Sequence, residues 1–221
     1  KARYVNKLVN MNVFADDTGL EIGTTEANNI SDYGGGATAT YGIGINGQNA
    51  PKIENNSVTS GTGSGAVYGI NVAAACDGSL ILNANYISDI TGGSGILYGI
   101  FAESGGNRSI YSNQIFNLNG AGTVYGLYWA TNPISPSGDI YKNNVYNLTS
   151  TSSSGPVRGI YIDGGTTVNV YNNFVSDLKM PAGNAAEPIT GIHVNAGTSV
   201  RLFYNTIFLN ATSSGINFGS I

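Results

Sequence analysis

Two short motifs alternate along most of the chain, and the pair recurs about every 30 residues. The first motif is an aromatic or polar residue, a glycine, and then two apolar residues separated by one variable position. Fainter copies lie at 19–22 and 215–218. A repeat of this length is typical of solenoids, in which one copy cannot bury its apolar face alone. The steps between glycines are 27, 30, 27, 33 and 32 residues, for Gly42, Gly69, Gly99, Gly126, Gly159 and Gly191.

The second motif is an apolar residue, two variable positions, an asparagine, one variable position and then Ile or Val. The apolar positions of both motifs alternate with period two, which indicates strands rather than helices. Three short strands per repeat, each stacked on its copies about 4.8 Å apart, make a parallel solenoid. The sequence therefore predicts one all-β domain over residues 1–221, with about seven or eight coils.

The asparagine of the second motif predicts a ladder inside the solenoid. In a parallel stack each of these side chains lies over the next, so amide-to-amide hydrogen bonds can run along the axis. Such bonds satisfy a polar group at a buried turn, where an unpaired amide is costly. The expected structural ladder consists of Asn28, Asn56, Asn85, Asn113, Asn143, Asn173 and Asn205.

The two motifs resemble those of the right-handed parallel β-helix superfamily, the pectate-lyase-like fold, over nearly the whole chain. The resemblance implies a single-stranded, right-handed solenoid. It does not select an activity, because the superfamily includes polysaccharide-active enzymes, phage tailspikes and adhesins. A narrower stretch, VRLFYNTIFLNATSSGINFG (200–219), resembles repeats in large secreted surface proteins of Bacteroidota-type bacteria. That resemblance implies an extracellular or cell-surface location in a bacterium, and both ends of the chain look cut from a longer polypeptide.

Composition narrows the functional classes. The net charge is −4 with 10% charged residues, and no basic stripe could meet a phosphate backbone, which argues against nucleic acid as a partner. No apolar run approaches the ~18 residues of a membrane span, so membrane insertion is not expected. The one cysteine, Cys76, lies among small apolar residues and is expected to be a half-buried structural thiol. The turns after the asparagine strands are rich in Gly, Ser and Thr, as in a solvated rim or a binding face.

No catalytic residue, metal or cofactor is expected within this chain. By the resemblance, hydrolases of this fold would need clustered aspartates on adjacent coils, and lyases an acidic calcium site with a Lys or Arg. Arg108, Arg158 and Arg201 lie on separate coils with no acidic column beside them. His193 is expected to point outward between two apolar neighbours, and the next coil offers it no second ligand. Trp129 is expected in the core.

Two columns of outward rings form the candidate glycan-binding surface. On one side of a rod they would offer a platform for the apolar faces of sugars, with Asn and Tyr groups bonding to sugar hydroxyls. The alternative is that stacked rings only stabilise the sheets. The outward position of the glycine strand reads Glu21, Gly44, Asn71, Phe101, Tyr128, Tyr161, His193 and Asn217. The outward position of the asparagine strand reads Glu54, Asn83, Tyr111, Tyr141, Tyr171 and Phe203.

The expected function is that of a non-catalytic structural spacer or adhesin. Its partners would be polysaccharide, bound along the ring columns, or other domains of the same chain. One alternative is a polysaccharide lyase or hydrolase whose catalytic residues lie largely outside this segment. Another is a filament subunit that associates end to end, because an uncapped solenoid end exposes strand edges that can pair with another chain.

Overall fold

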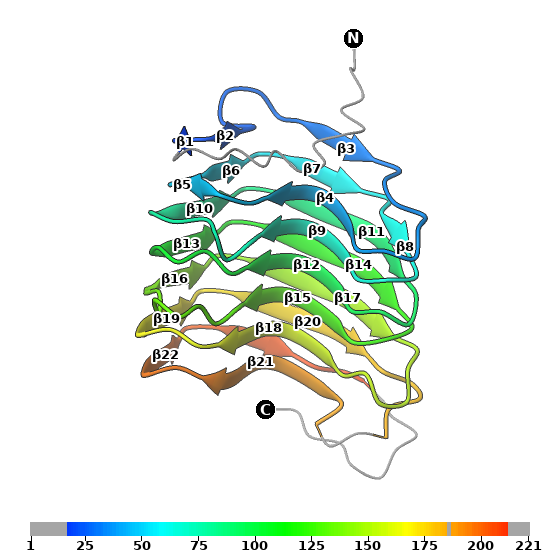
Figure 1. Cartoon of the computed structure of the whole chain (residues 1–221). Helices are drawn as coiled ribbons and strands as arrows, with labels where there is room; N and C mark the ends of the chain where they lie inside the picture. Colours follow the sequence, from blue (N-terminus) through cyan, green and yellow to red (C-terminus); the bar gives the residue numbers. More distant parts are fainter. Residues whose placement is uncertain (1–16, 185–186, 212–221) are drawn as a thin grey trace.

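The structure is a computed structural model that describes residues 17–184 and 187–211. These residues form 23 strands and no helix. The strands stack along one axis in three long parallel sheets, and the chain passes through each sheet once per coil (Figure 1). The predicted all-β parallel solenoid is confirmed. Within the described ranges, no helix is long and apolar enough to cross a membrane.

Each sheet collects one kind of strand from successive coils. Sheet I holds the strands that precede the ladder asparagines: β2 (Glu21–Ile22), β6 (Lys52–Glu54), β10 (Leu80–Asn83), β13 (Arg108–Tyr111), β16 (Gly138–Tyr141), β19 (Thr167–Tyr171) and β22 (Ser199–Phe203). Sheet II holds the strands that follow them: β3 (Asn29–Ser31), β7 (Ser57–Thr59), β8 (Thr62–Gly63), β11 (Tyr86–Gly92), β14 (Gln114–Gly120), β17 (Asn144–Ser150), β20 (Phe174–Lys179) and β23 (Thr206–Phe208). Sheet III holds the glycine-motif strands: β4 (Thr40–Ile45), β9 (Val67–Val72), β12 (Leu97–Ala102), β15 (Val124–Trp129), β18 (Val157–Asp163) and β21 (Ile189–Ala196). A separate short pair joins β1 (Asp17–Thr18) to β5 (Gln48–Asn49).

The solenoid has about six turns, as the six strands of sheet III show, rather than seven or eight. The faint first copy of the glycine motif, at 19–22, was expected to lie in the same sheet as the other copies, and this prediction was wrong. Its Ile22 pairs with Ile53, so β2 belongs to sheet I. The faint last copy, at 215–218, lies outside the described residues.

The predicted asparagine ladder is confirmed over all seven positions. The amide Nδ2 of each asparagine donates to Oδ1 of the asparagine in the next coil, at 2.8–3.0 Å from Asn28 to Asn205. Within the stack the backbone N–H also donates to that Oδ1, as from Asn85 to Asn113 at 3.0 Å. The amide nitrogen Nδ2 also donates its other hydrogen to a backbone carbonyl of the preceding coil. Asn85 Nδ2, for example, donates to the carbonyl oxygen of Ile53 at 2.8 Å. These amides are therefore satisfied although Asn85 is only 1% exposed.

The glycine of the first motif is explained by a close approach between sheets II and III. A Cβ added to Gly99 would lie 2.4 Å from Cγ2 of Ile115 and 2.6 Å from the carbonyl oxygen of Gly126. The same clash recurs between Gly126 and Val145 at 2.4 Å. The glycine of one motif therefore packs against the Ile or Val that follows the asparagine of the other, which is why the two motifs recur together.

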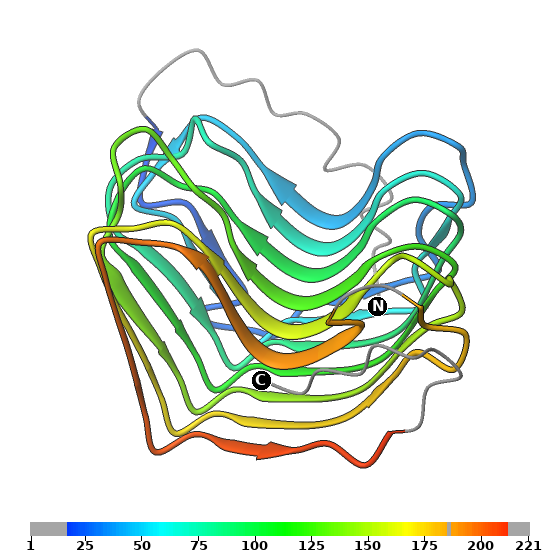
Figure 2. The ribbon, with the colours of Figure 1, turned by 90° about the horizontal axis from the view of Figure 1, so that it is seen from below.

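Sheet III bends inward at this glycine. In β12 both Gly99 and Ile100 are buried, so the alternation of inward and outward positions is interrupted there. Figure 2 shows the strands of sheet III dipping toward the interior between two rows of loops. The outward side chains on either side of the bend consequently face the same inward-curved surface.

A fully buried cation, Arg108, lies among the expected aliphatic residues of the core. Its guanidinium donates to the carbonyl oxygens of Ser104 and Ala102 and lies 4.6 Å from the ring centroid of Trp129. Burial lowers the pKa of Arg108 to about 9, so it remains charged at neutral pH. Arg108 is therefore a structural residue. Trp129 is also fully buried, which confirms its predicted place in the core. Cys76 is fully buried as well, whereas it was expected to be half-buried.

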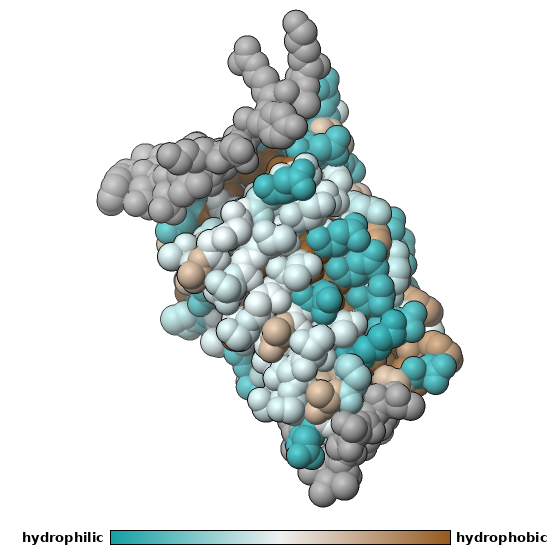
Figure 3. All heavy atoms as spheres, turned by 90° about the vertical axis from the view of Figure 1, so that its right-hand side faces the viewer, coloured by the Kyte–Doolittle hydropathy of each residue, from teal (hydrophilic) through white to brown (hydrophobic). Residues whose placement is uncertain are grey.

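The Gly/Ser/Thr-rich turns between sheets II and III line one edge of the solenoid. Figure 3 faces this edge, which is mostly of intermediate hydropathy with hydrophilic patches. A shallow hollow there is lined by Gly, Ser and Thr residues of three successive coils. The residues that line this hollow carry no ionisable side chain.

Candidate functional site

The first predicted ring column lies on the outer side of sheet III. Phe101, Tyr128, Tyr161 and His193 are in register on four consecutive strands. Their ring centroids are 5.2, 4.8 and 5.0 Å apart, with interplanar angles of 24°, 28° and 12°. The strand pairing thus repeats a ring at each coil, and the rings contact one another along the axis.

The second predicted column lies on sheet I, so the two columns do not form one platform. Tyr111, Tyr141, Tyr171 and Phe203 are in register there, with centroids 4.8–5.0 Å apart and rings within 5° of parallel. The prediction that both columns lie on one side of the rod was wrong. The chain turns a corner between sheet III and sheet I, and therefore the outward positions of the two strands face different directions (Figure 2).

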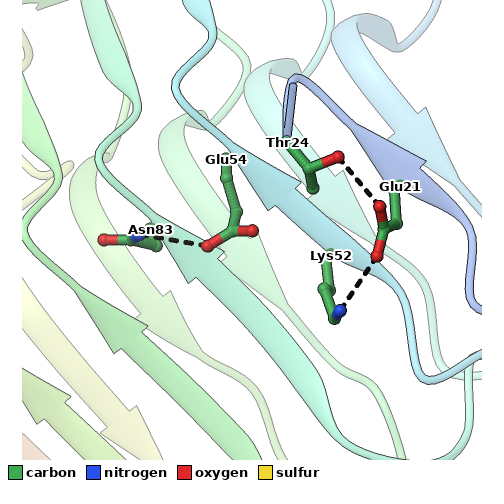
Figure 4. Close-up of polar contacts among 5 residues, drawn as sticks. All are labelled: Glu21, Thr24, Lys52, Glu54 and Asn83. Atoms are coloured by element: carbon green, nitrogen blue, oxygen red, sulfur yellow. Dashed lines mark hydrogen bonds and ion pairs between the residues drawn. The ribbon is translucent and has the colours of Figure 1, made fainter. Parts of the chain in front are cut away.

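The N-terminal part of the sheet I surface is polar instead of aromatic. Glu21 does not join the first column, because β2 belongs to sheet I and Glu21 pairs with Lys52. The Lys52 ammonium donates to the Glu21 carboxylate at 2.9 Å, and in the neighbouring column the Asn83 amide donates to the Glu54 carboxylate at 3.0 Å (Figure 4). The last expected member of the first column, Asn217, lies outside the described residues.

Sheet III carries a further tyrosine column that the sequence reasoning missed. Tyr41, Tyr68, Tyr98 and Tyr125 precede the glycines of the first motif and stack with centroids 4.8–5.3 Å apart. Strict alternation would point these tyrosines inward, with the apolar residues of the motif. They point outward because the alternation is interrupted at the glycine. The signal was present in the motif itself, because a tyrosine directly precedes the motif glycine in four successive copies.

The two columns of sheet III contact each other edge to face. The Tyr98 and Phe101 centroids are 5.1 Å apart at 73°, and those of Tyr125 and Tyr128 are 4.9 Å apart at 87°. We call this double column of rings the sheet III ring surface. Because inner rings such as Tyr128 have a stacked neighbour on both faces, the surface presents ring edges and hydroxyls. Hydrogen bonding to a ligand is therefore better supported than stacking of sugar faces on ring faces.

Polar groups gather at the C-terminal end of this ring surface. The Tyr128 hydroxyl donates to Oδ2 of Asp163 at 2.8 Å, and the Asn195 amide donates to the other carboxylate oxygen at 2.7 Å. His193 Nδ1 lies 3.6 Å from a carboxylate oxygen of Glu187. Burial, followed by the nearby Arg158 charge, lowers the pKa of His193, so its imidazole is neutral at pH 7.

Arg158, the cation at this end of the ring surface, already has hydrogen-bond partners. The Arg158 guanidinium donates to Thr190 Oγ1 at 2.9 Å and to the backbone oxygen of Glu187. His193, as predicted, is an outward residue, and its ring stacks on Tyr161. Within the described residues, no group of three or more His, Cys, Asp or Glu side chains is placed to hold a metal ion.

The partly buried tyrosines of sheet III predict a loss of stability at alkaline pH. Burial raises the pKa of Tyr68, Tyr98 and Tyr125 above the ordinary value of 10.0, and burial together with the hydrogen bond to Asp163 raises that of Tyr128. A raised pKa means that the neutral form stabilises the fold. That contribution is complete below the unfolded value of 10.0 and is lost as the pH rises through the folded values.

We therefore expect this contribution to the free energy of unfolding to stay constant around neutral pH and to fall steeply above about pH 10. Tyrosinate absorbance and circular dichroism, followed in one alkaline titration, measure this. Most tyrosines should ionise together with the loss of the strand signal, whereas the same protein in denaturant should titrate near the ordinary value. Ionisation of the tyrosines near pH 10 with the strand signal intact would contradict this assignment.

The comparisons with known proteins add no family to these observations. No family model matches the chain, and neither a curated protein nor a solved structure matches it significantly.

Proposed function

We propose that this solenoid is a stiff, non-catalytic segment of an extracellular or cell-surface protein that binds an extended, neutral polysaccharide along sheet III. The observation that carries the proposal is the sheet III ring surface. It repeats a hydroxyl-bearing ring at coil after coil, so it offers a linear ligand the same group at a fixed interval.

The shape of sheet III supports a linear ligand. The sheet curves inward, and its rings are only partly exposed; Tyr41 at the N-terminal end is 45% exposed and Tyr98 in the middle is 8% exposed. The sheet I ring column lies on another side of the solenoid, and among the described residues no second ring column lies beside it. A polymer that lies along the axis would therefore contact more side chains on sheet III than on sheet I.

The charge of the surface supports a neutral ligand. Asp163 and Glu187 border the rings at one end, while Arg158 is committed to Thr190 and to a backbone oxygen. An acidic polysaccharide would bring its carboxylates near these carboxylates, and the described residues of sheet III offer no free cation to meet them. Neutral sugars, by contrast, can exchange hydroxyl hydrogen bonds with tyrosine hydroxyls and amides.

Affinity electrophoresis against panels of neutral and acidic polysaccharides tests the proposal. The native protein should be retarded by at least one neutral polymer, and a Tyr128→Ala/Tyr161→Ala variant should lose most of that retardation. The matched control is Tyr141→Ala/Tyr171→Ala, which removes two stacked rings from sheet I and should be retarded like the native protein.

A Tyr128→Phe variant separates the contribution of the Tyr128 ring to polysaccharide binding from that of its hydroxyl. It keeps the stacked ring but removes the hydroxyl, and we expect a partial loss of retardation if hydrogen bonding contributes. Equal loss in the sheet I and sheet III variants would show a general effect of ring removal rather than a site. No retardation of the native protein by any polymer would overturn polysaccharide binding and leave the spacer role alone.

A further inference from the structure

Tyrosine side chains recur once per coil along sheet III. The five strands β4, β9, β12, β15 and β18 pair in parallel, and their tyrosine positions stay in register. Each of these strands carries at least one tyrosine of the sheet III ring surface. In strand order these are Tyr41, Tyr68, Tyr98, the pair Tyr125 and Tyr128, and Tyr161. A row of tyrosines therefore follows the axis of the solenoid over five coils (Figure 1).

The row has a nearly constant interval. Ring centroids are 4.8–5.3 Å apart in the column from Tyr41 to Tyr125, and 4.8 Å apart between Tyr128 and Tyr161. Hydrogen bonding between parallel strands fixes this interval, because it holds neighbouring strands about 4.8 Å apart. The interval therefore does not adjust to a ligand, and a linear molecule bonds to every coil only if its own repeat is close to it.

The row stays continuous where it changes column at β15. Tyr125 and Tyr128 lie edge to face on that strand, and the Tyr161 ring is 5.1 Å from Tyr125 as well as 4.8 Å from Tyr128. The Tyr128 hydroxyl donates its hydrogen to Asp163 at 2.8 Å, so its oxygen is left to accept a hydrogen bond from a ligand hydroxyl. A ligand that follows the row therefore meets a tyrosine at each of the five coils.

The geometry of sugar linkages decides which polysaccharides have this repeat. In a β-1,4-linked glucan, both bonds that join a pyranose ring to its neighbours are equatorial and lie at opposite ends of the ring, so successive sugars continue in one direction. Such a chain is a ribbon that advances by nearly the full length of a sugar per unit, which is close to the interval between the tyrosines. An α-1,4-linked glucan has one axial bond at each linkage, so its chain turns at every unit and leaves a straight row.

We propose that the sheet III ring surface binds a ribbon-shaped polysaccharide with equatorial 1,4 linkages, such as a β-1,4-linked glucan, mannan or xylan, with one sugar unit over each coil. The ligand class rests on the polysaccharide binding proposed above and adds the linkage and the register. Each sugar exposes hydroxyl groups along the edges of the ribbon, where they hydrogen bond to the tyrosines. Because every coil offers a similar group, each added sugar contributes a similar increment of affinity until the row is filled.

Two oligosaccharide series of the same monosaccharide test the linkage. One is β-1,4-linked glucose and the other is α-1,4-linked glucose, each from the disaccharide to the pentasaccharide, titrated into the native protein by isothermal titration calorimetry. In the β-linked series the affinity should rise about two- to tenfold per unit, which is the gain that one net hydrogen bond supplies. The α-linked series should show no such rise. The β-1,4-linked mannose and xylose series run alongside to cover the other two sugars.

A Tyr68→Phe variant tests the register of one sugar per coil. The variant keeps the stacked ring and removes the hydroxyl from one coil. The pentasaccharide covers all five coils, so it should lose about one increment of affinity, two- to tenfold. The disaccharide should bind as it does to the native protein, because it can occupy β12, β15 and β18 instead. Tyr171→Phe removes a hydroxyl from the sheet I column and is the matched control, which should leave both affinities unchanged.

The outcomes separate the ribbon ligand from polysaccharide binding in general. Suppose a neutral polymer retards the native protein in electrophoresis, but the affinities favour the α-linked series or do not grow with length. That result would overturn the ribbon class and leave polysaccharide binding standing. An equal loss for the disaccharide and the pentasaccharide in Tyr68→Phe would overturn the register of one sugar per coil. Failure of every polymer and oligosaccharide to bind would overturn both proposals.

Discussion

An Asn85→Ala protein is expected to unfold at a much lower urea concentration than the native protein. The substitution removes the acceptor for two hydrogen bonds from Asn56 and the donor to the Ile53 carbonyl, all at a position that is 1% exposed. Each buried polar group left without a partner costs about 1–3 kcal/mol, so the total loss should be about 3–5 kcal/mol.

Asn83→Ala is the matched control, because Asn83 ends strand β10 two residues before Asn85 but points outward. Its amide donates to the Glu54 carboxylate, which solvent can also satisfy (Figure 4). The expected loss is below about 1 kcal/mol. Equilibrium urea unfolding followed by circular dichroism compares the two variants. If both lose the same free energy of unfolding, the ladder is not a major source of stability.

Gly99→Ala is expected to destabilise the protein by about 3 kcal/mol or more, because the added methyl has no space. It would lie 2.4 Å from Cγ2 of Ile115 and 2.6 Å from the Gly126 carbonyl oxygen. The Ile115 side chain can change rotamer, but the carbonyl belongs to the backbone of the next coil. Relief therefore requires β12 to move away from its neighbour β15 within sheet III, which disturbs the strand pairing there.

Gly36→Ala controls for the general effect of replacing a glycine. The nearest atoms to a Cβ there are 3.8 Å away, so the substitution should be neutral or slightly stabilising through the unfolded state, by up to about 1 kcal/mol. Thermal and urea unfolding of the two variants measure the difference. A Gly99→Ala protein as stable as Gly36→Ala would show that the sheets approach less closely than the structure indicates.

The sequence by itself determined the features that a parallel stack repeats without change. The period-two apolar positions indicated strands, and a fixed spacing of about 30 residues places each asparagine over the next one. The ladder from Asn28 to Asn205 followed from these two facts alone. The same logic put Phe101, Tyr128, Tyr161 and His193 in one column, because residues at equal positions in successive coils are neighbours whatever the shape of the coil.

Only the tertiary structure decided how the coil bends and which direction each column faces. The repeat contains no information about the angle between strands of one coil, so the sequence could not show that the sheet I and sheet III rings face different ways. Strict alternation also fails where sheets II and III approach at Gly99, which turns Tyr98 outward. Arg108 occupies a core position because the backbone carbonyls of Ser104, Ala102 and, from the next coil, Ala130 meet there. These outcomes depend on contacts between separate strands and turns, whereas the ladder depends only on the register of the repeat.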